Sequence, residues 1–189
     1  MKGEQDMVTE EVIKSGELYD ASDAELYEVQ WRCNDLMYEY NQTRPSNRRK
    51  QKEILKELLG DLGEGCVIEP PLRANWGKNT HLGDHVYVNF NLTLVDDADI
   101  YIGSHVMIGP NVTIATAGHP LEAELRKKGM QFNKSVRIGD GAWIGAGVII
   151  LPGVTVGENT TIGAGSVVTK DIPANTVAYG NPCRVRKTL

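Results

Sequence analysis

Aliphatic residues recur at every sixth position along much of this chain. The series consists of Leu82, Val88, Leu94, Ile102, Ile108, Ile114, Ile138, Ile144, Ile150, Val156, Ile162 and Val168. A period of six is not helical, because a helix returns to one face after three or four residues, and no simple strand runs this long. A short strand followed by a tight turn, repeated many times, satisfies the pattern. It predicts a parallel β-helix of hexapeptide repeats.

The residues around these aliphatic positions support turns at regular places. Glycine follows many of them, and the positions two residues earlier are small or branched, as at Ala142 and Thr160. Two interruptions stand out. Between Leu94 and Ile102 the step is eight residues, which predicts a two-residue bulge around residues 96–99. Residues 118–135 lack the pattern, and we expect a loop extruded from the coil, a place where repeat proteins often carry function.

The N-terminal third of the chain has the sequence patterns of helices. Residues 22–25 fit a capping box that starts a helix running through about Tyr40. Ser46 is the expected cap of a second helix, which ends at Gly60. We therefore expect a helical segment over residues 1–60 and a β-helix with a C-terminal tail over residues 61–189, joined as one structural unit. The helical pair would cover an exposed edge of the β-helix.

Composition excludes several classes of function. The 189 residues carry a formal net charge of −5 with both signs spread along the chain, which disfavours a nucleic-acid partner. No apolar run reaches the roughly 18 residues of a membrane span, and the first residues lack a signal-peptide core. Cys33, Cys66 and Cys183 are scattered, so we expect buried, reduced thiols in a cytoplasmic protein.

Several longer motifs match a known family across nearly the whole chain. They are LMYEYN (36–41), IEPP (68–71), NFNLTLVDDADIYIG (89–103), TAGHP (116–120), WIGAGVIILPGVTVG (143–157), IGAGSVVTKDIP (162–173) and GNPCRV (180–185). The sequence resembles the maltose/galactoside O-acetyltransferases, which include the nodulation acetyltransferases. The resemblance implies a left-handed β-helix and a homotrimer with active sites in clefts between subunits. It also implies acetyl-CoA as donor and a sugar hydroxyl as acceptor.

His119 is the candidate general base. It lies in the Gly-His-Pro corner where the repeat stops, although a histidine beside proline in a turn is more often structural than catalytic. The resemblance places the family's catalytic base on this residue. An imidazole with a pKa near 6.5 can take the proton of a hydroxyl as that hydroxyl attacks a thioester.

The resemblance assigns further residues to the two substrates. Asn89 would line the acceptor pocket and stabilise the transition state, and Asn75 and Asp97 would contact the acceptor. Galactoside-type members carry serine at the position of Asn75, so the sugar preference stays open. The expected coenzyme A contacts are Ala146, Ala164, Thr169, Lys170, Arg184 and Lys187. The Ala146 N–H is also a candidate oxyanion donor, and Trp143 is a candidate wall of the cleft.

Alternatives remain at this point. His81, His85 and His105 are expected on the surface, and their spacing does not fit the metal-binding histidines of the γ-class carbonic anhydrases, so no metal is expected. The glycines at 163–165 belong to the repeat and make no nucleophile elbow, which favours direct transfer. A non-sugar acceptor, or a β-helix that only binds or scaffolds, is the competing hypothesis. The physiological acceptor, the pathway and any assembly beyond the trimer stay open.

Overall fold

The computed structural model describes residues 9–22 and 24–189. The capping box expected at residues 22–25 includes Asp23, which lies outside the described residues. The helices are α1 (Glu10–Lys14), α2 (Ala24–Gln42), α3 (Arg48–Leu58) and α4 (Ala123–Lys127). Within the described part of the chain, no helix is both long and apolar enough to cross a membrane.

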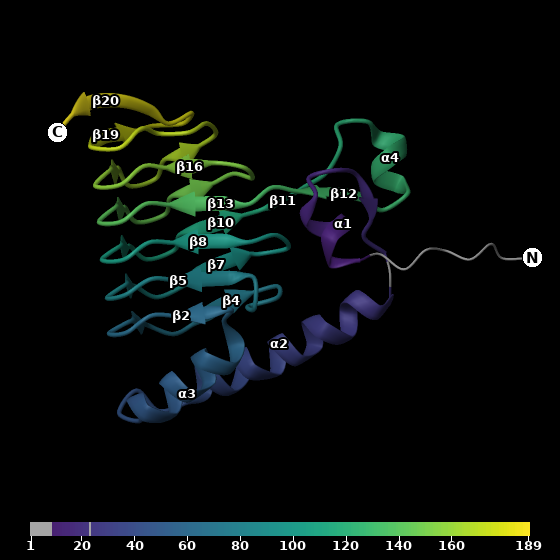
Figure 1. Ribbon diagram of the computed structural model, residues 1–189, viewed down its shortest axis with the longest axis horizontal. Helices are drawn as coiled ribbons and strands as arrows, with labels where there is room; N and C mark the ends of the chain where they lie inside the picture. Colours follow the sequence, from purple (N-terminus) through teal and green to yellow (C-terminus); the bar gives the residue numbers. More distant parts are fainter. Residues whose placement is uncertain (1–8, 23) are drawn as a thin grey trace, which may run out of the picture.

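Short strands stack into three parallel sheets that form the faces of a prism (Figure 1). Face 1 consists of β2 (Asp61–Leu62), β5 (Thr80–Leu82), β8 (Ile100–Ile102), β13 (Val136–Ile138) and β16 (Thr155–Val156). Face 2 consists of β3 (Val67–Ile68), β6 (Tyr87–Val88), β9 (Met107–Ile108), β14 (Trp143–Ile144), β17 (Thr161–Ile162), β19 (Thr176–Tyr179) and the antiparallel β20 (Arg184–Thr188). Face 3 consists of β4 (Leu72–Ala74), β7 (Leu92–Val95), β10 (Thr113–Ala115), β15 (Ile149–Ile150) and β18 (Val167–Val168).

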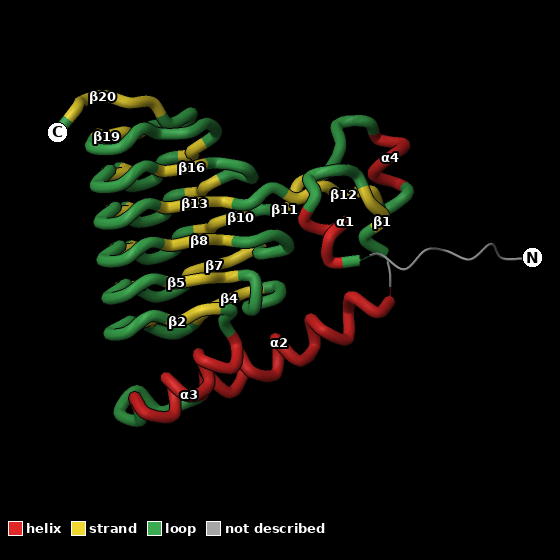
Figure 2. Tube along the Cα trace, viewed as in Figure 1, coloured by secondary structure: helices red, strands yellow, loops and turns green. Residues whose placement is uncertain are grey.

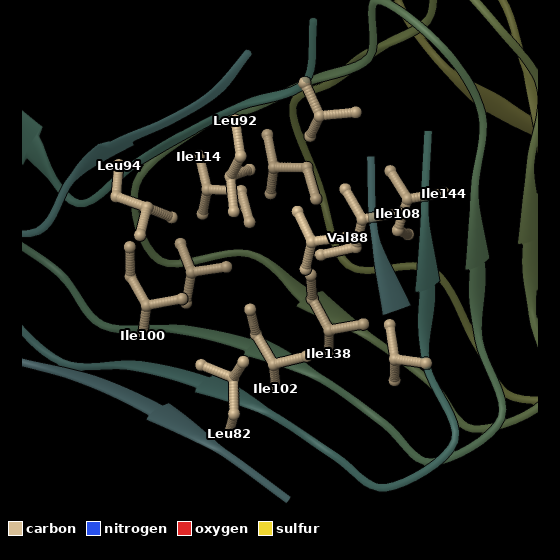
Figure 3. Close-up of a cluster of buried hydrophobic side chains, with 14 of the residues drawn as sticks. Leu82, Val88, Leu92, Leu94, Ile100, Ile102, Ile108, Ile114, Ile138 and Ile144 are labelled. Carbon is tan, nitrogen blue, oxygen red and sulfur yellow. The ribbon is translucent and has the colours of Figure 1, made fainter. Parts of the chain in front are cut away.

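The core is the stack of inward aliphatic side chains from all three faces (Figure 3). Every residue of the six-residue series is buried, and Leu82, the least buried of them, is 5% exposed. Equivalent positions lie above one another, as with Val88, Ile108 and Ile144. Burying such a side chain contributes about 1.5–3 kcal/mol, so the repeat stabilises the prism along its whole length. The predicted β-helix of hexapeptide repeats with an N-terminal helical region is confirmed.

The extruded segment is more regular than its sequence indicated. It leaves after β10 and returns in register, because β13 pairs directly with β8. Within it, β11 (Ala117–Gly118) and β12 (Met130–Asn133) form an antiparallel pair with α4 between them. A two-residue strand near the N-terminus, β1 (Tyr19–Asp20), also pairs with β12. We call residues 116–135 the arm, which projects sideways from the coils beside α1 (Figure 1).

The helical region lies under the first coil, where α2 packs against β4 and α3 against β2 (Figure 2). The expected cap at Ser46 is wrong: Asn47 is the N-cap of α3, and its side chain accepts a hydrogen bond from the Lys50 N–H. Both residue types make good caps, so composition alone does not decide between neighbours. The buried side of α3 includes Ile54, Leu55 and Leu58.

Candidate active site

A groove of about 540 Å³ runs along the outer surface of face 2. It brings together three residues that the sequence analysis singled out, Asn89, Ala146 and Ala164, and Trp143 forms part of its wall. Residues alternate inward and outward along each strand, so the outward side chains of β6, β9 and β14 line the groove. These are Tyr87, Met107 and Trp143, each about half exposed.

The corner beside this groove requires glycine. A Cβ on Gly109 would lie 2.7 Å from the backbone nitrogen of Ala146 on the next coil, and a Cβ on Gly145 would lie 2.6 Å from that of Ala164. The small residues let successive coils approach one another. The Ala146 carbonyl accepts a hydrogen bond from Gly165. Its N–H has no partner among the described residues, so this amide is free to donate toward the groove.

Asn89 follows β6 at the lower end of the groove. Its backbone N–H donates to the Ile108 carbonyl, and its side-chain oxygen accepts a hydrogen bond of 2.8 Å from the Phe90 N–H. The contact fixes the orientation of the amide. Its NH₂ group, for which the described residues offer no acceptor, is available as a donor to a developing negative charge.

His119 lies in the arm, directly after β11, and its side chain is exposed. Its Nδ1 lies 3.0 Å from the backbone oxygen of Met130 on β12. A carbonyl only accepts hydrogen bonds, so Nδ1 must carry the proton, and Nε2 of the neutral ring has the free lone pair. This is the arrangement that a general base needs. His119 is not among the residues lining the face 2 groove of its own chain.

Asn75 and Asp97 are joined in a second polar site, at the bulge between β7 and β8. The Asn75 side-chain amide donates to one carboxylate oxygen of Asp97 over 3.0 Å. Gln131 of the arm donates to the other over 3.2 Å. Asp97 is 7% exposed, so its carboxylate is held by neighbours on two sides. The expected bulge at residues 96–99 is therefore present and binds the arm to the coils.

Three further residues of this cluster were missed by sequence reasoning: Tyr19, Gln131 and Asn133. The Tyr19 hydroxyl accepts hydrogen bonds of 2.9 Å from the side-chain amides of both others. Burial raises the pKa of Tyr19, which keeps it a neutral phenol. No motif marks these residues, because β1 is only two residues long and its contacts cross more than a hundred positions of sequence.

A fully buried carboxylate, Asp96, sits behind the cluster. One of its oxygens accepts from the backbone N–H groups of Asn75, at 3.0 Å, and Trp76, at 2.9 Å. The other accepts from the Thr80 hydroxyl over 3.0 Å. Burial raises the pKa of Asp96 to about 6, although these donors oppose the shift. Asp96 thus ties the turn that carries Asn75 to the bulge that carries Asp97.

The other expected coenzyme A contacts lie at the C-terminal end of the stack. Thr169 and Lys170 follow β18, whereas Arg184 and Lys187 lie on β20, which pairs with β19. All four are exposed. They lie outside the lining of the groove. The strands β19 and β20 are at the C-terminal end of the stack (Figure 1). The positive charges of Lys170, Arg184 and Lys187 suit the phosphates of a ligand that extends past the end of the groove.

The remaining histidines lie at other corners. His85 and His105 are exposed, as expected, and their rings stack with centroids 5.0 Å apart. His81 differs from the expectation of a surface residue: it is half-buried between Asp61, at 2.6 Å, and Asp99, at 3.3 Å. In the described residues no group of three or more potential ligands is arranged to hold a metal ion. The expectation of a metal-free reaction stays a prediction.

A hexapeptide-repeat β-helix with an exposed histidine and a corner groove defines the class of hexapeptide acyltransferases. Two family models match the chain: the maltose acetyltransferase hexapeptide capping motif, over residues 13–63, and the bacterial transferase hexapeptide (six repeats), over residues 135–170. The chain belongs to the maltose/galactoside O-acetyltransferase family and is an acetyl-CoA-dependent O-acetyltransferase.

Individual relatives extend over nearly the full chain. The galactoside O-acetyltransferase of Lactococcus lactis is 52% identical over 178 residues, which cover 94% of this chain and 86% of that protein. A crystal structure of a maltose O-acetyltransferase from Clostridium difficile 630 superposes with a TM-score of 0.94 at 45% identity, covering 97% and 98% of the two chains. A structure of a galactoside acetyltransferase in complex with coenzyme A superposes with a TM-score of 0.93 at 46% identity. The match covers 96% of this chain and 91% of that chain.

Proposed function

We propose that this enzyme transfers the acetyl group of acetyl-CoA directly to a hydroxyl of a sugar of the maltose, glucose or galactoside type, with His119 as general base. The observation that carries the proposal is the contact between Nδ1 of His119 and the Met130 carbonyl. It leaves the lone pair on Nε2 of an exposed imidazole at the base of the arm.

The reaction proceeds without a covalent enzyme intermediate. Nε2 of His119 takes the proton of the acceptor hydroxyl while the hydroxyl oxygen attacks the thioester carbonyl carbon. The oxyanion of the tetrahedral intermediate accepts hydrogen bonds from the Asn89 amide and the Ala146 N–H. Collapse breaks the carbon–sulfur bond, and the leaving thiolate receives the proton from the imidazolium. The products are an acetyl ester and coenzyme A.

The acceptor is held by Asn75, Asn89 and Asp97. An ionised carboxylate accepts hydrogen bonds from sugar hydroxyls, and the two amides can donate or accept. The Asn75 and Gln131 contacts to Asp97 orient its carboxylate. This arrangement supports a polyhydroxylated acceptor.

The donor lies along face 2. The pantetheine chain of acetyl-CoA follows the groove past Ala146 and Ala164, where small side chains leave room. Its phosphates meet Thr169, Lys170, Arg184 and Lys187 on the last coils. The cytoplasmic location expected from the sequence stays a prediction.

The complete site requires a second copy of the chain. His119 lies on the arm, while the groove that contains Asn89 and Ala146 lies on face 2, and His119 does not line it. In a homotrimer, the arm of one subunit places its histidine against the groove of the next. The half-exposed Tyr87, Met107 and Trp143 of face 2 are then covered in part.

The test follows thiol release from acetyl-CoA with maltose, glucose and a galactoside as acceptors, and with serine as a non-sugar acceptor. We expect turnover with a sugar and a kcat roughly 10²–10⁴-fold lower in His119→Ala, because a general base contributes that much. His105→Asn is the matched control, since it removes an exposed histidine that lies outside the arm and the groove lining. Full turnover in His119→Ala would overturn the mechanism, and turnover with serine alone would overturn the sugar acceptor.

A further inference from the structure

A second cavity, of about 300 Å³, lies between the helical region and the first coil, away from the face 2 groove. Residues of α2, α3, β2 and β3 enclose it. Apolar side chains such as Leu55 and Leu62 form much of its wall, and Cys66 lies at its coil side. Nothing in the proposed acetyl transfer uses this cavity.

Gln51 is the unusual residue of its lining. It is 3% exposed on the side of α3 that otherwise buries Ile54, Leu55 and Leu58. Its side-chain oxygen accepts a hydrogen bond of 3.3 Å from Arg48. Its NH₂ group is buried and has no partner in the described part of the chain. An amide donor left unpaired in the interior is unfavourable, so it calls for an acceptor that enters the cavity.

The charged side chains that line the cavity are positive. Arg48 and Lys52 line it, and none of the acidic side chains that the structure describes does. Arg48 is paired with Glu69 over 3.2 Å, while Lys52 forms no ion pair within residues 9–22 and 24–189. A ligand that matches this lining has an anionic, hydrogen-bond-accepting head and an apolar body.

We propose that this cavity, which we call the cap cavity, binds a small carboxylate with an apolar tail. One carboxylate oxygen accepts the orphan N–H of Gln51, and the positive charge of Lys52 and Arg48 lies beside the head. The tail packs against Leu55 and Leu62, whose surfaces gain by leaving water. Binding is non-covalent, and the site is independent of the proposed reaction.

Cys66 provides a local reporter of occupancy. It is partly exposed and lines the cap cavity, whereas Cys33 and Cys183 are buried. Alkylation of Cys66 by iodoacetamide, followed by peptide mass spectrometry, therefore measures access to the cavity in the full-length protein. Three probes separate the head from the tail: hexanoate, the neutral hexan-1-ol, and inorganic phosphate.

We expect hexanoate to slow Cys66 alkylation saturably, by about tenfold or more, and the other two probes to act far more weakly. Gln51→Leu should weaken hexanoate binding by at least about tenfold, which equals roughly 1.4 kcal/mol. Without ligand, Gln51→Leu should melt at the same or a higher temperature than the parent, because it removes an unpaired buried donor. The exposed Gln42→Leu is the matched control and should bind hexanoate normally.

Two outcomes overturn the proposal. One is the absence of saturable protection by hexanoate in the parent protein. The other is equal protection in Gln51→Leu and the parent, which would mean that the amide does not contact the head. The double variant Arg48→Gln/Lys52→Gln gives a further test. It should also weaken hexanoate binding, and unchanged binding would overturn the proposed contact between the cations and the carboxylate head.

Discussion

Asp96 shows how burial and hydrogen bonding oppose each other at a single residue. Its carboxylate is fully buried, yet it accepts hydrogen bonds from two backbone N–H groups and the Thr80 hydroxyl. Burial is the larger effect and raises its pKa from 3.8 to about 6. A raised pKa means that the folded state holds the proton more tightly than the unfolded state does. The ionised form is therefore unfavourable for folding.

This shift predicts a pH dependence of stability. Between the unfolded pKa near 4 and the folded pKa near 6, the contribution of Asp96 should fall by roughly 3 kcal/mol as pH rises. Asp96→Asn does not titrate and should lack this fall. Urea unfolding of both proteins from pH 4 to 7 measures the difference, with the exposed Asp35→Asn as control. A constant difference between Asp96→Asn and the parent across this range would contradict the prediction.

Asp97 gives a second prediction at this scale, which rests on its proposed role toward the acceptor. Asp97→Asn removes the charge and sets an amide against the donors of Asn75 and Gln131. We expect KM for the acceptor to rise about tenfold, a loss in the range of one hydrogen bond to a charged group. KM for acetyl-CoA should stay unchanged. Steady-state kinetics with each substrate varied in turn measures both values.

Asp99→Asn is the control for that experiment, because Asp99 lies in the same bulge but pairs with Lys14 and His81. Equal changes in both KM values of Asp97→Asn would indicate general damage to the bulge. In that case Asp97 would have no specific contact with the acceptor.

The sequence located irregular places in the coil where a motif was local. The bulge at 96–99 and the corner at His119 follow from breaks in the repeat, and the resemblance gave each a role. The sequence did not predict the cluster of Tyr19, Gln131 and Asn133. Their shared hydrogen bonds join two segments that are far apart in the chain and outside the six-residue repeat. The orphan amide of Gln51 escaped as well, since only packing shows that it is buried.

At the scale of elements, the repeat predicted the coils well because each strand contributes one inward aliphatic residue in a fixed phase. The strand β1 and the pair β11–β12 were not predicted. These strands are two to four residues long. They form because β1 and β11 both pair with β12 of the arm. Intrinsic preference is weak in segments this short, so tertiary contact decides their structure.

The corner glycines give a prediction that separates crowding from backbone strain. A Cβ on Gly109 would meet backbone atoms of the next coil at 2.7–3.0 Å, and backbone cannot yield cheaply. Gly109→Ala should therefore lose more than about 3 kcal/mol of unfolding free energy and distort the groove. Gly147 has φ of 66° and open space around its Cβ position, so Gly147→Ala should lose only about 1–2 kcal/mol.

Chemical denaturation of the two glycine variants, with identical substitutions and neighbouring coils, makes the comparison. Circular dichroism before unfolding shows whether the coils remain intact. Similar losses for Gly109→Ala and Gly147→Ala would show that the coils can separate to admit a methyl group, contrary to the tight stacking described above.

At the scale of the whole molecule, the two halves of the proposed site lie on different parts of one chain. The arm carries His119, and face 2 carries Asn89, Ala146 and Ala164. The arm projects away from the coils, beside α1 (Figure 1). In a monomer, His119 would not reach the groove. The geometry suits an assembly in which each arm reaches the groove of a neighbouring subunit. Closed cyclic assembly repeats the same contact around the ring.

Complementation between two inactive variants tests the shared site. His119→Ala removes the base, and Ala164→Trp fills the groove with an outward side chain at an exposed position. Each variant alone should be nearly inactive. When they are co-expressed, some pairs of neighbours join an intact arm to an intact groove. Random mixing in a trimer regenerates about a quarter of the sites, so we expect about a quarter of the parental kcat.

The controls make the complementation result specific to shared sites. Separately purified variants that are mixed without subunit exchange should stay inactive, and dual affinity tags confirm that the co-expressed material contains both chains. If each chain held a complete site, every subunit in a mixed assembly would still carry one defect. Mixed assemblies that remain inactive would therefore place His119 and the groove in the same subunit's site, and the arm would have to fold back onto its own coils to reach it.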